Sequence, residues 1–112
     1  MAEESRDQLH RQQRAVKVLE QLLGRVANEK LPVISWSIAG SAAQPALIGR
    51  CDAENAADRR NDFEAWREAL AATALPDETD VDGRTRLRAS VEDTFQAITV
   101  VLVADIQPEQ GA

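Results

Sequence analysis

The fold of this chain is decided by residues 95–106, which read Phe-Gln-Ala-Ile-Thr-Val-Val-Leu-Val-Ala-Asp-Ile and form its most apolar, most β-branched stretch. In a β-strand, alternate side chains point to opposite faces of the sheet. One face would carry Ile98, Val100, Leu102, Ala104 and Ile106, and the other Ala97, Thr99, Val101, Val103 and Asp105. Both sets are mostly apolar, which is typical of a strand covered on both faces. We therefore expect it inside a sheet whose second face is at least partly buried.

Three more segments have the alternation of strands. Residues 33–38 are joined by a loop at 40–45 to residues 46–51, which predicts a hairpin. Within the second of these strands, Gly49 indicates a bulge or a close approach to a neighbouring backbone. Residues 85–91 follow the turn dipeptide Asp-Gly, and residues 92–94 would turn the chain into the central strand.

Two helices are also predicted. Ser5 and Gln8 have the spacing of a capping box, so the first helix would run from about residue 5 to about residue 28. The second would begin at a capping residue between Asp52 and Asn55. It would end before Pro76, because a residue that precedes proline avoids helical angles. The acidic segment 76–83 would then be a loop.

The resulting order is α-β-β-α-β-β, with hairpin-length connections within each pair of strands. We therefore expect an α+β fold in which two helices pack on one face of a four-stranded antiparallel sheet. A length of 112 residues is typical of one domain. That domain would span 1–112, with 1–4 and 107–112 as frayed tails.

The sheet face without helices is a candidate partner surface. It would combine arginines at alternate positions with valines of the central strand, and its residues are Arg84, Arg86, Arg88, Val101 and Val103. Such arginines would stand about 6.6–7 Å apart, close to the spacing of phosphates along a nucleic acid strand. They could also pair with carboxylates of a protein partner. Alternatively, their aliphatic stems would lie across the two valines with the guanidinium groups in water.

The first helix is a candidate dimer element. Its apolar arc between Ala15 and Ala27 covers about half of the circumference, whereas an arc of about 100° is enough to seat a helix on a sheet. The excess predicts a second contact, made either by the second helix or by a second copy of the chain. The candidate dimer residues are Val18, Leu22 and Val26.

Composition excludes several classes of protein. The 19 Asp plus Glu against 13 Lys plus Arg give a net charge of −6, which argues against general affinity for nucleic acid or anionic membranes. Cys51 is the only cysteine, so an intrachain disulfide is impossible and a reduced, intracellular setting fits. We expect a cytoplasmic protein, because no signal-peptide pattern and no apolar run of about 18–20 residues occurs.

The sequence contains no motif of an active site that keeps the required spacing. Residues 78–83 resemble the first half of a calcium loop, but Ala89 stands where the bidentate Glu is needed. Cys51 and His10, the candidate nucleophile and base, lie on different predicted elements. We therefore expect no catalytic, cofactor-binding or metal-binding residues and no cofactor.

Four stretches carry a resemblance to known proteins: residues 32–37, Ile48-Gly49-Arg50, residues 63–70 and residues 85–89. Together they look like a group of small uncharacterised proteins of actinobacterial genomes and their phages or integrative elements. The resemblance covers about residues 31–106 and implies a provenance, since that group has no established activity. The acidic α+β architecture also resembles the small dimeric chaperones of bacterial secretion systems, although this chain appears one strand short of them.

These observations favour a non-enzymatic protein-interaction module that forms a homodimer. The reason is surplus apolar surface on a short chain that has no recognisable site. One alternative is an accessory regulator that binds nucleic acid with Arg84, Arg86 and Arg88. Another is a small acidic chaperone-like protein.

Overall fold

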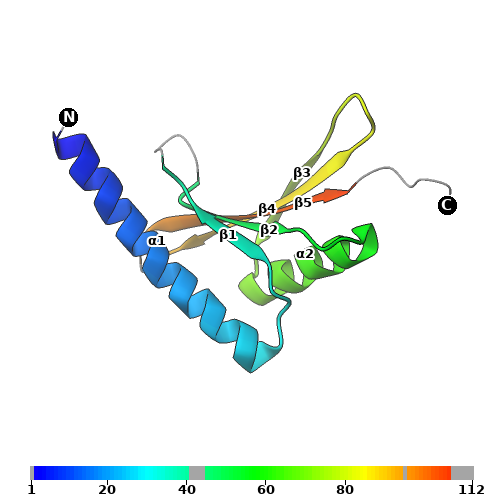
Figure 1. Ribbon diagram of the computed structural model, residues 1–112, viewed down its shortest axis with the longest axis horizontal. Coiled ribbons are helices and arrows are strands. Elements are labelled where there is room, and N and C mark those ends of the chain that lie inside the picture. The colour runs from blue at the N-terminus through cyan, green and yellow to red at the C-terminus, as the bar shows by residue number, and fades with distance from the viewer. Residues whose placement is uncertain (1, 41–44, 95, 107–112) are drawn as a thin grey trace.

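The computed structural model describes residues 2–40, 45–94 and 96–106, without the side chains of residues 2–5. Its elements are α1 (Ala2–Glu29), β1 (Ser35–Ile38), β2 (Leu47–Cys51), α2 (Ala56–Leu70), β3 (Thr73–Thr79), β4 (Thr85–Asp93) and β5 (Ile98–Ile106) (Figure 1). The α+β class is confirmed. Residues 2–4, expected as a tail, belong to α1, and the tail predicted at 107–112 lies outside the described residues.

The sheet has five strands in the order β1-β2-β5-β4-β3. The predicted central strand does lie at its centre, where β5 pairs antiparallel with β4 and parallel with β2. The expectation of a four-stranded, wholly antiparallel sheet was therefore wrong. After β2 the chain passes through α2, β3 and β4 before it reaches β5. This connection is long enough for β5 to return beside β2 in the same direction, which a parallel pair requires.

The missing strand is β3, at residues expected to be the end of a helix and a loop. Helix α2 ends at Leu70 because Ala71 adopts a left-handed conformation (φ 53°) that turns the chain back toward the sheet. Strand β3 contains Pro76, beside an irregularity in its pairing with β4 between Leu75 and Glu78. Proline cannot donate a backbone hydrogen bond, but an edge strand tolerates it at a bulge.

The predicted start of the second helix is confirmed by its capping contacts. The Asn55 side chain accepts hydrogen bonds from the backbone N–H groups of Ala57 (2.7 Å) and Asp58 (3.3 Å). The turn before β5 lies later than expected, because β4 continues to Asp93 and the Asp93 carboxylate accepts the N–H of Gln96 at 2.7 Å. Residue 95 lies outside the described part of the chain, and β5 begins at Ile98.

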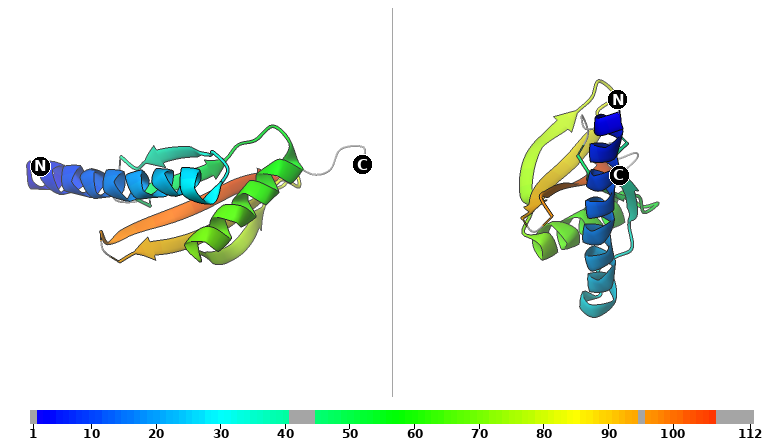
Figure 2. Two further views of the ribbon diagram at one scale, coloured as in Figure 1. Left: turned by 90° about the horizontal axis from the view of Figure 1, so that it is seen from below. Right: turned by 90° about the vertical axis from the view of Figure 1, so that its left-hand side faces the viewer.

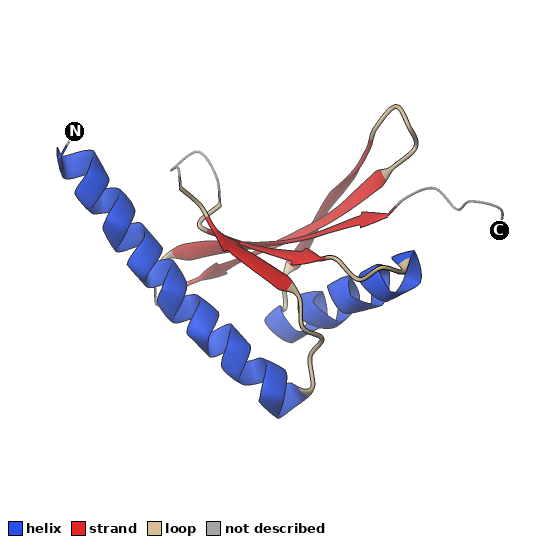
Figure 3. Ribbon diagram, viewed as in Figure 1, coloured by secondary structure: helices blue, strands red, loops and turns tan. Residues whose placement is uncertain are grey.

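Both helices pack on the same face of the sheet, as predicted (Figure 2, Figure 3). Ala15, Val18 and Leu22 of α1 join Phe63 and Trp66 of α2 in one buried cluster. From β5 this cluster receives the set Ile98, Val100, Leu102 and Ala104, all at most 2% exposed. The first of the two apolar faces of the central strand is therefore covered by helices.

Two tryptophans connect the β1 end of the sheet to α2. The rings of Trp36 and Trp66 meet edge to face with centroids 5.2 Å apart, and the indole N–H of Trp66 donates to the Pro32 carbonyl at 2.8 Å. The Trp36 ring lies over Gly49, where an added Cβ would stand 2.7 Å from ring carbon Cζ3. Gly49 thus marks a close approach to a side chain, whereas a bulge or a close approach to a neighbouring backbone was expected.

We predict that Gly49→Ala lowers the free energy of unfolding by about 1–3 kcal/mol, because the Trp36 ring is held against Trp66 and cannot move away. Urea denaturation measures this loss. The control is Gly24→Ala, on an exposed part of α1 with no atom within 4 Å of the new Cβ. It should raise stability by about 0.5–1 kcal/mol, the usual gain for this change in a helix. Equal effects of the two changes would contradict the assigned contact.

Candidate functional site

The helix-free face of the sheet brings the predicted partner surface together. The strand register sets Val103 directly between Arg88 of β4 and Arg50 of β2. It also sets Val101 between Ser90 and Ile48. Val103 is only 7% exposed, although no helix lies on this side of the sheet. Arginines stand beside it on both neighbouring strands, and the aliphatic stem of an arginine can cover apolar surface of this kind.

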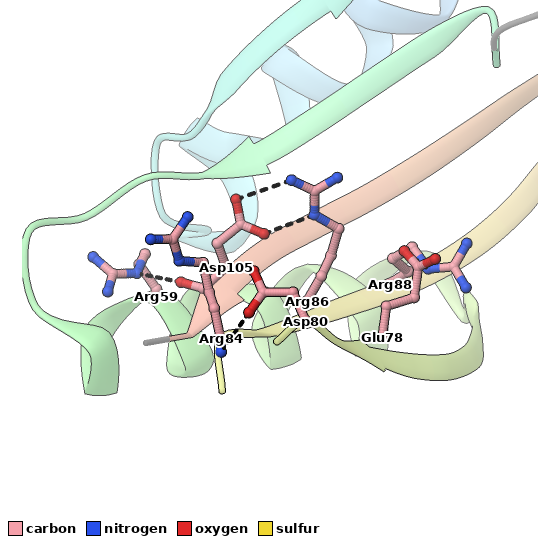
Figure 4. Close-up of polar contacts among 7 residues, drawn as sticks. All are labelled: Arg59, Glu78, Asp80, Arg84, Arg86, Arg88 and Asp105. Carbon is pink, nitrogen blue, oxygen red and sulfur yellow. Dashed lines mark hydrogen bonds and ion pairs between the residues drawn. The ribbon is translucent and has the colours of Figure 1, made fainter. Parts of the chain in front are cut away.

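Arg86 is bound to a carboxylate of the same chain. Its guanidinium forms a two-pronged contact with Asp105 of β5, at 2.7 Å from Nε and 3.3 Å from Nη2 (Figure 4). On the other side of the same residue, Arg59 of α2 donates from Nε to the Asp105 carbonyl at 2.8 Å. The hydrogen bond from Arg86 lowers the pKa of Asp105, and the charges of Arg86, Arg50 and Arg84 act in the same direction.

Arg88 contacts β3, where its buried Nε forms an ion pair but no hydrogen bond within the described residues. Its Nε lies 3.3 Å from Oε1 of Glu78 (Figure 4), and its Nη2 also donates a hydrogen bond to the Pro76 carbonyl at 3.2 Å. Arg84 differs, because it precedes β4 and its contact with Asp80 is made by its backbone N–H at 3.0 Å. Two of the three predicted arginines are therefore paired with carboxylates of their own chain. This arrangement supports the interpretation in which the stems cover the valines.

Sequence reasoning missed both carboxylate partners. Glu78 had been assigned to a loop, but residues 73–79 form the edge strand β3, whose register sets Glu78 opposite Arg86 and within ion-pair distance of the next outward arginine, Arg88. Asp105 had been placed on the helix-free face, where the antiparallel register with β4 sets it opposite Arg86. The sequence did contain a signal for this pair, namely an acidic residue, Asp105, in an otherwise apolar strand. These residues line a shallow, open hollow of about 350 Å³, formed by Glu78, Thr79, Asp80, Arg84, Arg86 and Asp105.

The outer surface of α1 is the second candidate site. The structure places two of the predicted dimer residues, Val18 (3% exposed) and Leu22 (6%), in the chain's own core, and the third, Val26, packs partly buried against that core. The exposed apolar residues of this helix are instead Leu9 (52%), Val16 (40%) and Leu23 (50%). We call this set the outer stripe. Its members recur every seven residues, the spacing of one seam in a helix pair.

Helix α2 does not cover the outer stripe. The hydrogen bond between the helices joins Arg25 Nη2 to the Ala69 carbonyl at 2.7 Å, near the C-terminal ends of both. Leu9, Val16 and Leu23 lie on another side of α1 from Arg25 and remain half exposed. The sequence showed that α1 has more apolar surface than one sheet needs, but only the packing shows which residues of that arc face outward.

The residues considered for chemistry are separated. Cys51 is buried in β2, whereas His10 is exposed on α1. The acidic segment is a turn in which the Asp80 carboxylate accepts the N–H groups of Asp82 (2.9 Å) and Arg84 (3.0 Å). Within the described residues, three or more metal-ligating side chains do not gather anywhere.

Comparisons with protein-family models, with curated proteins and with solved structures found no match. The resemblance to small actinobacterial and phage proteins therefore remains a prediction.

In the described part of the chain, neither helix has the length and apolar character needed to cross a membrane.

We predict that Asp105→Asn lowers the free energy of unfolding by about 0.5–1 kcal/mol at pH 7, the range for a partly exposed ion pair. The folded-state pKa of Asp105 is lowered, so its contribution is present above the unfolded pKa of about 4 and is lost as pH falls through the folded pKa. Denaturation curves of both proteins between pH 7 and pH 2 should therefore converge at the acid end. A difference that stays constant would exclude the assigned pair.

Burial raises the pKa of the Cys51 thiol to about 12, and the charge of Asp62 adds to the increase. We predict that a thiol reagent at pH 8 labels Cys51 only as fast as the protein unfolds. Gln21→Cys, on the exposed surface of α1, provides a second thiol for comparison. That thiol should react at the rate of a free peptide, while fast labelling of Cys51 would contradict its burial.

Proposed function

We propose that this protein is a non-enzymatic protein-interaction module that acts as a homodimer, and that the outer stripe of α1 is its contact surface. The observation that carries the proposal is the half exposure of Leu9, Val16 and Leu23 on one side of a 28-residue helix. Such a helix is about 42 Å long, so the stripe can extend along a second helix for several turns. Aligned apolar residues of this kind are costly to leave in water.

The arrangement of the stripe favours a second copy as the partner. Leu9 and Leu23 lie seven residues to either side of Val16. An antiparallel pair of α1 helices would therefore set Val16 against Val16 of the partner and Leu9 against Leu23 of the partner. A two-fold contact of this kind uses one patch twice, which is the commonest form of homodimer interface.

The nucleic-acid alternative has weaker support. It requires a row of guanidinium groups free to contact phosphates, but Arg86 is held by Asp105 and Arg88 by Glu78. The net charge of −6 also opposes the approach of a polyanion. We therefore regard these arginines mainly as the cover of the second face of the sheet.

We predict that the wild-type chain is a dimer at micromolar concentration in size-exclusion chromatography with light scattering, and that Val16→Glu converts it to a monomer. The change sets two carboxylates against each other in an apolar seam, which should weaken the dimer at least about tenfold. Val16 is 40% exposed and lies outside the core cluster, so the circular dichroism spectrum should be preserved.

The matched control is Gln21→Glu, which adds the same charge to an exposed position of α1 outside the outer stripe. This variant should remain a dimer. A wild-type chain that is monomeric at about 100 μM would overturn the proposal, and so would dimers that are insensitive to Val16→Glu.

A further inference from the structure

The free edge of β1 is a second surface with unused bonding capacity. β1 is the last strand of the sheet on its side, and the Ala39 N–H donates to the Ala46 carbonyl at 3.0 Å. Along a strand of an antiparallel pair, residues alternately point their backbone N–H and C=O groups toward the partner strand and away from it. The bond between Ala39 and Ala46 therefore decides which residues of β1 point toward β2. The backbone groups of Ser35 and Ser37 then face β2, while those of Trp36 and Ile38 point outward from the edge.

The opposite edge of the sheet carries features that hinder strand addition, and the described residues of the β1 edge do not. β3 carries Pro76 and an irregular register, both of which hinder the addition of another strand. β1 has neither proline nor a bulge among its paired residues. Of the two edges, β1 is therefore the one open to strand addition.

The outer stripe of α1 lies on the same side of the molecule as the β1 edge. Gln12 of α1 donates to the Ala39 carbonyl at the end of β1, at 3.1 Å. At about 100° per residue, Gln12 is within about 60° of every member of the outer stripe around the helix axis. Arg14, which donates to the Gln96 carbonyl beside β5 at 3.2 Å, lies on the far side of the helix. The stripe and the free edge thus form one continuous surface.

The middle of the outer stripe also lies level with the middle of β1. α1 and β1 run in nearly opposite directions beside each other (Figure 1, Figure 2). From Gln12 to Val16 is about 6 Å along the helix, and from Ala39 back to Ser37 is about 6.6 Å along the strand. Because Gln12 contacts Ala39, Val16 lies level with Ser37. A single two-fold axis can therefore pass beside both residues.

We infer that a second copy of this chain adds to the free edge of β1, with one two-fold axis beside Ser37 and Val16 that makes both the β1 pair and the α1 pair antiparallel. This inference rests on the proposed homodimer and specifies its geometry. Trp36 would exchange backbone hydrogen bonds with Ile38 of the partner, since both residues point outward. The two five-stranded sheets would become one continuous sheet.

The distances in this arrangement are compatible. Packed helices lie about 8–10 Å apart, which is about two strand spacings. Two α1 helices that lie near the last strands of their own sheets would therefore meet across the join. A parallel pair of α1 helices needs a two-fold axis along the helices, and that axis could not pair the two β1 edges.

Cysteine cross-linking tests the geometry in a Cys51→Ala background that light scattering shows to be dimeric. Ser37→Cys should form a disulfide with its own copy, because directly opposed residues of an antiparallel pair have Cβ atoms about 4.5–5.5 Å apart. Leu9→Cys alone should not, since the two positions would be about 21 Å apart. A mixture of Leu9→Cys and Leu23→Cys should cross-link, while Gln21→Cys should not react in any combination.

Amide hydrogen exchange separates this inference from the proposed function. The Trp36 and Ile38 amides should be protected in the dimer and should exchange at least about tenfold faster in the Val16→Glu monomer. A dimer in which these amides exchange freely, or in which Leu9→Cys links to itself, would overturn the geometry and leave the homodimer intact. A wild-type monomer would overturn both.

Discussion

The structure depends on the need to pair both edges and cover both faces of β5. This strand is apolar on each face, so neither face can be left in water without cost. Its edges carry backbone groups that must be hydrogen-bonded once buried. The chain meets the edge requirement by placing β2 on one side and β4 on the other. The sheet is mixed because β5, which follows α2, β3 and β4 in the chain, lies beside β2 and runs parallel to it.

The two faces of β5 are covered by different means. Helices α1 and α2 bury one face in the main core, which contains Trp66 at 0% exposure. On the other face, arginine stems from the neighbouring strands flank Val103, and the arginines of β4 are held in place by Glu78 and Asp105. The helix-free face of β5 is thus only partly covered, with Val103 buried, Val101 half-buried and Thr99 exposed. The arginines are first of all part of the architecture.

Covering β5 in this way leaves apolar surface elsewhere. α1 uses one side for the core, while its outer stripe remains half exposed next to the open edge of β1. Proteins normally cover both kinds of surface. The stripe is apolar, and the outward-facing backbone groups of β1 have no strand partner within the described residues. A second copy would cover both at once. These two surfaces, the outer stripe and the β1 edge, are the ones on which the proposed homodimer rests.

The sequence by itself determined the α+β class, the presence of two helices, the start of α2 and the central strand, because periodicity and capping are local signals. Only the tertiary structure decided the rest. Residues 73–79 became a strand because pairing with β4 outweighed their weak local preference and the presence of Pro76. The apolar arc of α1 was readable, but its division into buried Val18 and exposed Val16 depended on how the helix is rotated against the sheet. The carboxylate partners of Arg86 and Arg88 depended on which strands pair: Glu78 reaches Arg88 because residues 73–79 joined the sheet, and Asp105 opposes Arg86 in the β4–β5 pair.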